Sequence, residues 1–226
     1  MLKKNSLKFP SCHRKLLPLK TCGAVIVAAG NASRMGGIDK VMAELKGEPM
    51  IARTVRTFQN CDAISEIVIV TRPDLITPIS QLCREMPKVK AVVAGGKSRQ
   101  ESVNLGLNAL SDKVKLAAIQ DGARPLITWR VIDRVVRAAH TYGAAAPAIP
   151  VKDTIKTVQG GIVINTPDRA QLKAVQTPQV FDLDLLRGAL FQQLAAVHFA
   201  VDEIAVDPGL LVLGPALHIG SGHGGG

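Results

Sequence analysis

The chain has 226 residues, of which 47% are hydrophobic, and its formal net charge is +10. This length suits one catalytic domain with a full core. The sequence has no run of about 18 apolar residues and no apolar N-terminal stretch, so we expect no membrane span and no secretory signal, and a cytoplasmic location. The four cysteines show no C-x-x-C spacing, which indicates reduced thiols rather than a disulfide framework.

The positive charge is concentrated at the start of the chain. Six lysine and arginine residues and no acidic residue lie within residues 1–20, and we expect 1–21 to form a disordered basic leader. Aromatic residues make up only 3% of the chain, too few for the stacking platforms of single-strand nucleic-acid binders. A nucleic-acid partner is therefore not expected. The leader alone leaves a basic nucleic-acid module or an organelle transit peptide as alternatives.

Apolar segments of two kinds alternate along the chain. Short apolar runs predict strands, and apolar residues at helical spacing predict helices. The strands are expected at 24–28, 64–70, 91–94, 116–119 and 144–149, and the helices at 50–59, 101–110 and 131–139. This alternation predicts an α/β fold, a Rossmann-like and mostly parallel sheet sandwiched by helices, with ligands at the C-terminal ends of the strands.

Two later segments break this pattern. Within residues 150–175, short β-like pieces flank Gly160-Gly161, which predicts a hairpin arm that projects from the sheet. The folded domain is expected to lie between the leader and the tail, over 22–205. Residues 206–226 are expected to form a flexible tail, because 208–226 contains no Lys, Arg, Asp or Glu and ends in a glycine-rich stretch.

The loop from Ala28 to Lys40, directly after the first expected strand, is suited to phosphate binding. It combines small residues with the cations of Arg34 and Lys40. Backbone N–H groups of such a loop can approach triphosphate oxygens, while the cations neutralise charge. The loop matches neither G-x-G-x-x-G nor G-x-x-x-x-G-K-[ST]. A glycine-rich turn with incidental basic residues is the alternative interpretation.

Two more loops of this kind follow the strands expected at 91–94 and 116–119. In the first, Ser98 and Glu101 have the spacing of a helix capping box, a purely structural alternative. In the second, Asp121 supplies a carboxylate that can hold Mg²⁺, an ion that binds few protein carboxylates together with substrate phosphates. Similar loops at three strand ends favour one nucleotide site over three unrelated turns.

Six segments occur in an order that resembles one enzyme family. They are 28–40, 95–103, 121–125, 151–156, 168–169 and 176–179. Over residues 22–205 the chain resembles the 2-C-methyl-D-erythritol 4-phosphate cytidylyltransferases. The resemblance implies a nucleotidyltransferase of isoprene biosynthesis that joins CMP from CTP to methylerythritol phosphate and releases pyrophosphate. It also implies a Mg²⁺ cofactor and a homodimer formed through the β-arm.

The resemblance also assigns roles to individual residues. Those expected to bind the nucleotide are Ala28, Ala29, Gly30, Gly96, Ser102 and Asp121, with Asp121 as the metal ligand. Those expected to act in catalysis are Arg34, Lys40 and Arg169, and those expected to hold the sugar phosphate are Thr154, Arg169 and Thr177. Thr154 and Arg169 lie on the expected arm. The resemblance therefore implies a site shared between two subunits.

The C-terminal part departs from the family pattern. Val201 stands where the family has a threonine, and 207–226 contains no lysine to match one that contacts the acceptor phosphate. We therefore expect reduced stability and weak or absent turnover. Two alternatives stay open: a cytidylyltransferase for another polyol phosphate such as ribitol 5-phosphate, and a non-catalytic relative that binds nucleotide or only assembles as a dimer.

Overall fold

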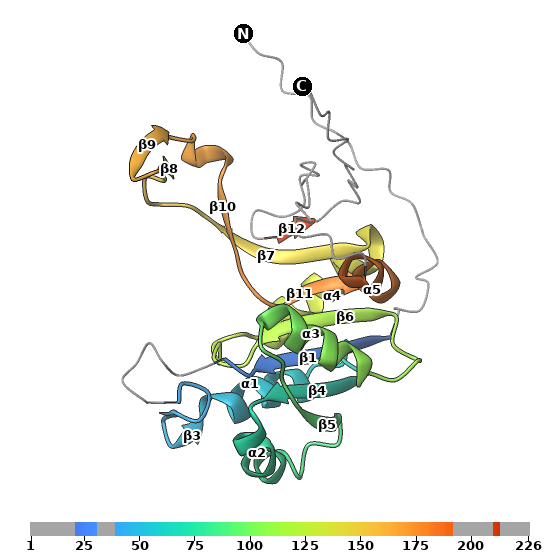
Figure 1. The fold of residues 1–226 in the computed structure, drawn as a ribbon. Coiled ribbons are helices and arrows are strands. Elements are labelled where there is room, and N and C mark those ends of the chain that lie inside the picture. Colours follow the sequence, from blue (N-terminus) through green and yellow to red (C-terminus); the bar gives the residue numbers. More distant parts are fainter. Residues whose placement is uncertain (1–20, 31–38, 192–209, 213–226) are drawn as a thin grey trace.

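A computed structural model describes residues 21–30, 39–191 and 210–212, and its centre is one β-sheet. The strands are β1 (Cys22–Ala28), β4 (Glu66–Thr71), β5 (Val89–Ala94), β6 (Leu116–Asp121), β7 (Ala144–Pro150), β10 (Lys173–Val175), β11 (Gln179–Asp182) and β12 (Leu210–Val212). Their order is β10-β7-β11-β6-β1-β4-β5, with β12 also paired to β7 (Figure 1). Neighbours among β5, β4, β1 and β6 are parallel, whereas β11 is antiparallel to β6 and β7. The predicted mostly parallel sheet is confirmed.

Alternate residues of β1 face two different layers of the core. Ile26 belongs to the cluster packed against α1 (Met50–Gln59), α2 (Ile76–Leu82) and α4 (Trp129–Tyr142). Val25 belongs to the opposite cluster, which includes α3 (Arg99–Asn108) and the start of α5 (Leu183–Phe191). Burial of an aliphatic or phenyl side chain contributes about 1.5–3 kcal/mol, so both faces stabilise the sheet. None of these helices, as far as the structure describes them, is long and apolar enough to cross a membrane.

Every strand and helix predicted from apolar periodicity is present, with slightly different ends. The helix expected at 101–110 begins at Arg99, and the one expected at 131–139 runs from Trp129 until Gly143 at φ 87°. Elements without a sequence prediction are the β2 (Glu44–Leu45) and β3 (Glu48–Pro49) hairpin, the 3-10 helices η1 (Pro73–Leu75) and η2 (Arg169–Gln171), α2, β11, α5 and β12. Most of these are short or contain proline, so their periodicity is weak.

The predicted hairpin arm lies between β7 and β11. Strands β8 (Thr157–Gln159) and β9 (Ile162–Asn165) pair antiparallel around Gly160 and Gly161, whose φ angles are 57° and 82°. The 3-10 helix η2 (Arg169–Gln171) then leads into β10, which returns to pair with β7. Figure 1 shows this hairpin standing away from the main sheet. Glycine fits such a turn because it adopts positive φ without a Cβ clash.

A short strand near the C-terminus completes the sheet. Residues Leu210–Val212 of β12 pair antiparallel with Ala145–Pro147 of β7. They lie within the segment 206–226 that the sequence analysis expected to be a flexible tail. The apolar Leu-Leu-Val run pairs with backbone groups of β7 that would otherwise form an open sheet edge.

Candidate active site

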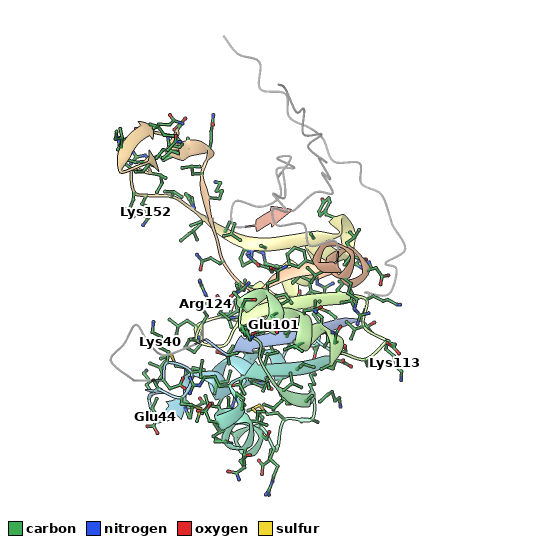
Figure 2. All side chains as sticks on the ribbon, viewed as in Figure 1. Lys40, Glu44, Glu101, Lys113, Arg124 and Lys152 are labelled. Carbon is green, nitrogen blue, oxygen red and sulfur yellow. The ribbon has the colours of Figure 1, made fainter. Side chains whose placement is uncertain are left out.

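A cavity of about 840 Å³ lies at the C-terminal ends of the central strands. It is bounded by the loops after β1, β5 and β6, the three that the sequence analysis singled out. Figure 2 shows Lys40, Glu101 and Arg124 at this edge of the sheet. The cavity is lined by Lys40 and by all six residues expected to bind nucleotide, namely Ala28, Ala29, Gly30, Gly96, Ser102 and Asp121. The structure therefore brings these predicted site residues together.

Small residues at the cavity are required by packing as well as by any ligand. A Cβ added to Gly95 would lie 2.3 Å from the Cβ of Ala29, and one on Gly122 would lie 3.0 Å from the Cβ of Ala28. The first separation excludes a side chain at Gly95 unless the β1 loop shifts, and the second leaves little room for one at Gly122, so small residues allow the loops after β1, β5 and β6 to approach each other. Backbone at a strand end can then come close to a phosphate.

In the loop after β5, a buried serine organises the backbone beside the cavity. Ser102, whose exposed fraction is 2%, accepts a hydrogen bond from the Gly96 N–H at 3.1 Å and donates to the Ser98 carbonyl at 2.9 Å. A Cβ on Gly96 would lie 2.2 Å from the Cγ of Glu101, so a side chain here would displace the Glu101 carboxylate from the Lys97 N–H. The backbone at Gly96 is thereby fixed at the cavity wall.

The capping alternative for this loop is confirmed in part. Ser98 is the N-cap of α3 and accepts a hydrogen bond from the Glu101 N–H at 3.0 Å. The Glu101 carboxylate returns to the N–H of Lys97, at 2.7 Å, rather than to that of Ser98. Capping does not remove this loop from the cavity, because Gly96, Ser98 and Ser102 all line it.

Asp121, at the end of β6, is paired with two arginines. Its Oδ1 accepts from Arg99 Nη2 at 3.0 Å and its Oδ2 accepts from Arg124 Nε at 2.9 Å. Arg124 also donates to the side-chain oxygen of Gln176. Both arginines line the cavity, although the sequence analysis gave neither a role. The available signal was that each arginine lies three residues after a residue at or just beyond a strand end, Arg99 after Gly96 and Arg124 after Asp121.

Lys40 and its neighbour Asp39 enter the cavity from the turn before β2. Asp39 Oδ2 accepts from Arg72 Nη2 at 2.6 Å, and Asp39 Oδ1 accepts from the Val41 N–H at 3.0 Å. Hydrogen bonds to Asp74 and Asp39 raise the pKa of Arg72 above its usual value. Lys40 itself is exposed and has no side-chain partner among the described residues. Sequence reasoning missed Arg72, which follows β4.

The remaining predicted site residues have different positions. Thr177 is buried beside the cavity, and its Oγ1 accepts from the Asp121 N–H at 3.5 Å. Thr154 and Arg169 are exposed on the arm and do not line the cavity, and Arg169 Nη1 donates to the Lys152 carbonyl at 3.2 Å. Figure 2 shows Lys152 on the arm, close to the hairpin and away from Lys40. Arg34, like Val201, lies outside the described residues.

The donor set fits a metal ion held mainly by substrate. Within the described part of the chain, no group of three or more His, Cys, Asp or Glu side chains could hold a metal. A lone carboxylate such as Asp121 suits Mg²⁺, which keeps several waters and binds one or two carboxylates plus phosphates. The Asp121 side chain is 31% exposed and borders the cavity, so it is accessible to such an ion.

A second cavity, of about 550 Å³, lies between the ends of α1 and α2. Its basic residues include Arg56, which forms an ion pair with Glu48 at 2.8 Å. None of its lining residues comes from the C-terminal ends of the sheet strands, where ligands of open α/β sheets bind. The 840 Å³ cavity is therefore the candidate active site.

The chain is similar to proteins whose names point to a single reaction. The family model for 2-C-methyl-D-erythritol 4-phosphate cytidylyltransferase matches residues 22–220. Relatives with that name are 42% identical in Symbiobacterium thermophilum, over 80% of this chain and 77% of the relative, and 45% identical in Halalkalibacterium halodurans, over 73% of each. The crystal structure of 4-diphosphocytidyl-2C-methyl-D-erythritol synthase from Anaerococcus prevotii has a TM-score of 0.70 and 28% identity, covering 81% of this chain and 79% of that one.

Proposed function

Because the chain belongs to the 2-C-methyl-D-erythritol 4-phosphate cytidylyltransferase family, we propose that it transfers CMP from CTP to 2-C-methyl-D-erythritol 4-phosphate and releases pyrophosphate. The observation that carries this proposal is the convergence of Lys40, Gly96, Ser102 and Asp121 on one cavity at the C-terminal edge of the sheet. Open α/β sheets bind nucleotides at that edge.

The proposed reaction needs positioning and charge neutralisation rather than a protein nucleophile. The phosphate monoester of the acceptor is largely ionised near neutral pH, because its second pKa is about 6. One of its oxygens attacks the α-phosphorus of CTP in line, the bond to the bridging oxygen breaks, and pyrophosphate leaves with that electron pair. Lys40 and Arg34 would stabilise charge on the α-phosphoryl oxygens, and Arg169 would orient the acceptor.

Nucleotide recognition is proposed for the loop after β5. The Ser102 hydroxyl holds the Gly96 backbone at 3.1 Å, so the wall beside the nucleotide is fixed before ligand binds. Ala28, Ala29 and Gly30 at the end of β1 would receive the triphosphate. A preorganised wall lowers the entropy cost of binding.

We assign the divalent cation to Asp121, the carboxylate at the end of β6. With the triphosphate bound, Asp121 would hold Mg²⁺, and the ion would supply positive charge against the phosphate oxygens. Arg99 and Arg124 each bind one oxygen of the Asp121 carboxylate, and these two contacts fix its orientation at the cavity. Each carboxylate oxygen can accept more than one contact, so these ion pairs are compatible with metal ligation.

The second substrate subsite is proposed to form between two copies of the chain. The arm exposes a set of large apolar side chains, namely Ile155, Val158, Ile162, Val163 and Ile164. Because consecutive strand residues point to opposite faces, the hairpin exposes apolar side chains on both faces, which favours contact with a partner. Thr154 and Arg169 on the same arm would then reach the cavity of a partner and hold the sugar phosphate beside Thr177.

The test is a pyrophosphate-release assay with purified protein, CTP, Mg²⁺ and methylerythritol 4-phosphate. Parallel reactions contain ribitol 5-phosphate, no acceptor, or ATP in place of CTP. Release that requires CTP and methylerythritol phosphate together is the expected result. Faster release with ribitol 5-phosphate would reassign the acceptor, and CTP binding without release would mean a non-catalytic relative whose altered C-terminal segment prevents turnover.

A further inference from the structure

The turn that carries Lys40 is anchored at its first residue by a side chain from another part of the sheet. Arg72, which follows β4, donates through Nη2 to Asp39 Oδ2 at 2.6 Å. Asp39 also stabilises the backbone of residues 39–43. Its Oδ1 accepts from the Val41 N–H at 3.0 Å, and its carbonyl accepts from the Ala43 N–H at 2.9 Å. One carboxylate therefore joins the turn to the end of β4.

The Asp39–Arg72 ion pair should be stronger than an ordinary surface ion pair, because both side chains are largely shielded from water. The side chains are only 20% and 24% exposed, so water screens their attraction less than at the surface. Asp74, which is 64% exposed, accepts from Arg72 Nε at 3.2 Å and from Nη2 at 3.1 Å. This second contact fixes the plane of the guanidinium, and Arg72 can therefore act as a rigid support for Asp39.

We propose that Arg72 is a positioning residue that holds Lys40 at the cavity through Asp39. The inference rests on the proposed function, in which Lys40 stabilises the transition state. Lys40 has no side-chain partner of its own among the described residues, so the location of its ammonium depends on the backbone at residue 39. Small displacements of a catalytic group can lower the rate by up to about a hundredfold.

The first measurement is hydrogen exchange of the turn, which does not depend on turnover. In Arg72→Gln the N–H groups of Val41 and Ala43 should exchange at least about fivefold faster than in the wild type. The matched control is Arg137→Gln, which removes another arginine that forms an ion pair, with Asp133 at 2.7 Å, far from the cavity. Equal exchange in Arg72→Gln and the wild type would overturn the proposal.

The second measurement is a double-mutant cycle on kcat. Arg72→Gln alone should lower kcat about tenfold with little change in the Kd for CTP, whereas Arg137→Gln should leave both unchanged. In a Lys40→Ala background the effect of Arg72→Gln should disappear, because the group that it positions is gone. Effects that multiply in the double variant would show that Arg72 acts independently of Lys40 and would overturn the proposal.

The two measurements separate failure of this inference from failure of the proposed function. If the wild type releases no pyrophosphate with any acceptor, the proposed function fails, and the exchange rates of Val41 and Ala43 alone decide whether Arg72 holds the turn. If the wild type is active and the cycle is additive, the proposed function stands and the role of Arg72 is refuted.

Discussion

Thr54 on α1 donates its hydroxyl to the carbonyl of Gly122 at 2.8 Å, so a helix side chain holds the turn directly after Asp121. Thr54→Val preserves the shape but leaves a buried carbonyl unpaired. We expect it to lower the free energy of unfolding by about 1–3 kcal/mol. Urea unfolding measures this loss. Thr57→Val, which removes only a bond to the Arg53 carbonyl within the same helix, is the control and should cost less.

Ser102→Ala tests the proposed nucleotide wall. Without the Ser102 hydroxyl the Gly96 N–H loses its acceptor, and we expect the Kd for CTP to rise about tenfold, equivalent to about 1.4 kcal/mol. Calorimetric titration with CTP and Mg²⁺ measures the change. Ser111→Ala removes a hydroxyl bonded to Glu66 at 2.7 Å, after the opposite end of α3, and should leave the Kd unchanged. A similar loss in both variants would assign the effect to general destabilisation.

Lys40→Ala should lower kcat by about a hundredfold to a thousandfold, the usual effect of removing one transition-state contact. Lys113→Ala removes the same charge from the opposite side of the molecule, as Figure 2 shows, and serves as control. Steady-state pyrophosphate release gives kcat and KM for both variants. A fall in kcat/KM that comes entirely from KM would assign Lys40 to substrate binding instead of catalysis.

Ile162→Asp tests assembly through the arm. This side chain is 71% exposed at the start of β9, and a charge there should prevent close apposition of two apolar arms. Analytical ultracentrifugation should find a dimer for the wild type and a monomer for the variant, with turnover reduced in parallel. Leu185→Asp changes an exposed leucine outside the arm and should remain dimeric. A monomeric, fully active wild type would contradict the shared-site proposal.

The buried thiol of Cys83 should make the free energy of unfolding depend on pH. Burial raises the pKa of its thiol from 9.0 to about 11. As the pH rises above about 9, the unfolded chain loses this proton before the folded chain does, so the stabilisation is complete below that pH. The stabilisation should then decrease progressively as the pH rises toward 11. In urea unfolding with reductant, the difference between wild type and Cys83→Ala should shrink over this range, and a constant difference would contradict the assignment.

The sequence was sufficient for the sheet and for the three loops because each signal there is local. A buried strand followed by small and charged residues can be recognised within about a dozen positions, as at Ala28 and Asp121. Arg72 and Arg99 escaped notice because their partners, Asp39 and Asp121, are 33 and 22 residues away in the chain. Such pairs exist only once β4 and β5 lie in their places in the sheet.

The way in which two chains assemble could not be predicted from the sequence in this way. The sequence predicted the arm from Gly160 and Gly161, and the hairpin is present. Where Thr154 and Arg169 act depends on a second chain, which neither periodicity nor a single folded copy specifies. The structure also differs from the expected flexible tail at Leu210–Val212, which form a strand. A run of three apolar residues does not identify a strand by itself, because its pairing depends on a free sheet edge elsewhere in the fold.

The pairing of strands at the start of the arm affects how the arm transmits force. Its outgoing strand β7 and returning strand β10 are hydrogen-bonded to each other, with Lys173 opposite Pro150 and Val175 opposite Ala148. The two legs are therefore hydrogen-bonded to each other where they leave the sheet, and a force applied at the hairpin tip is resisted by this pairing before it reaches the 840 Å³ cavity. Substitutions in β8 and β9 therefore change the surface that the tip presents, while the cavity-lining loops after β1, β5 and β6 keep their own sequence and backbone contacts.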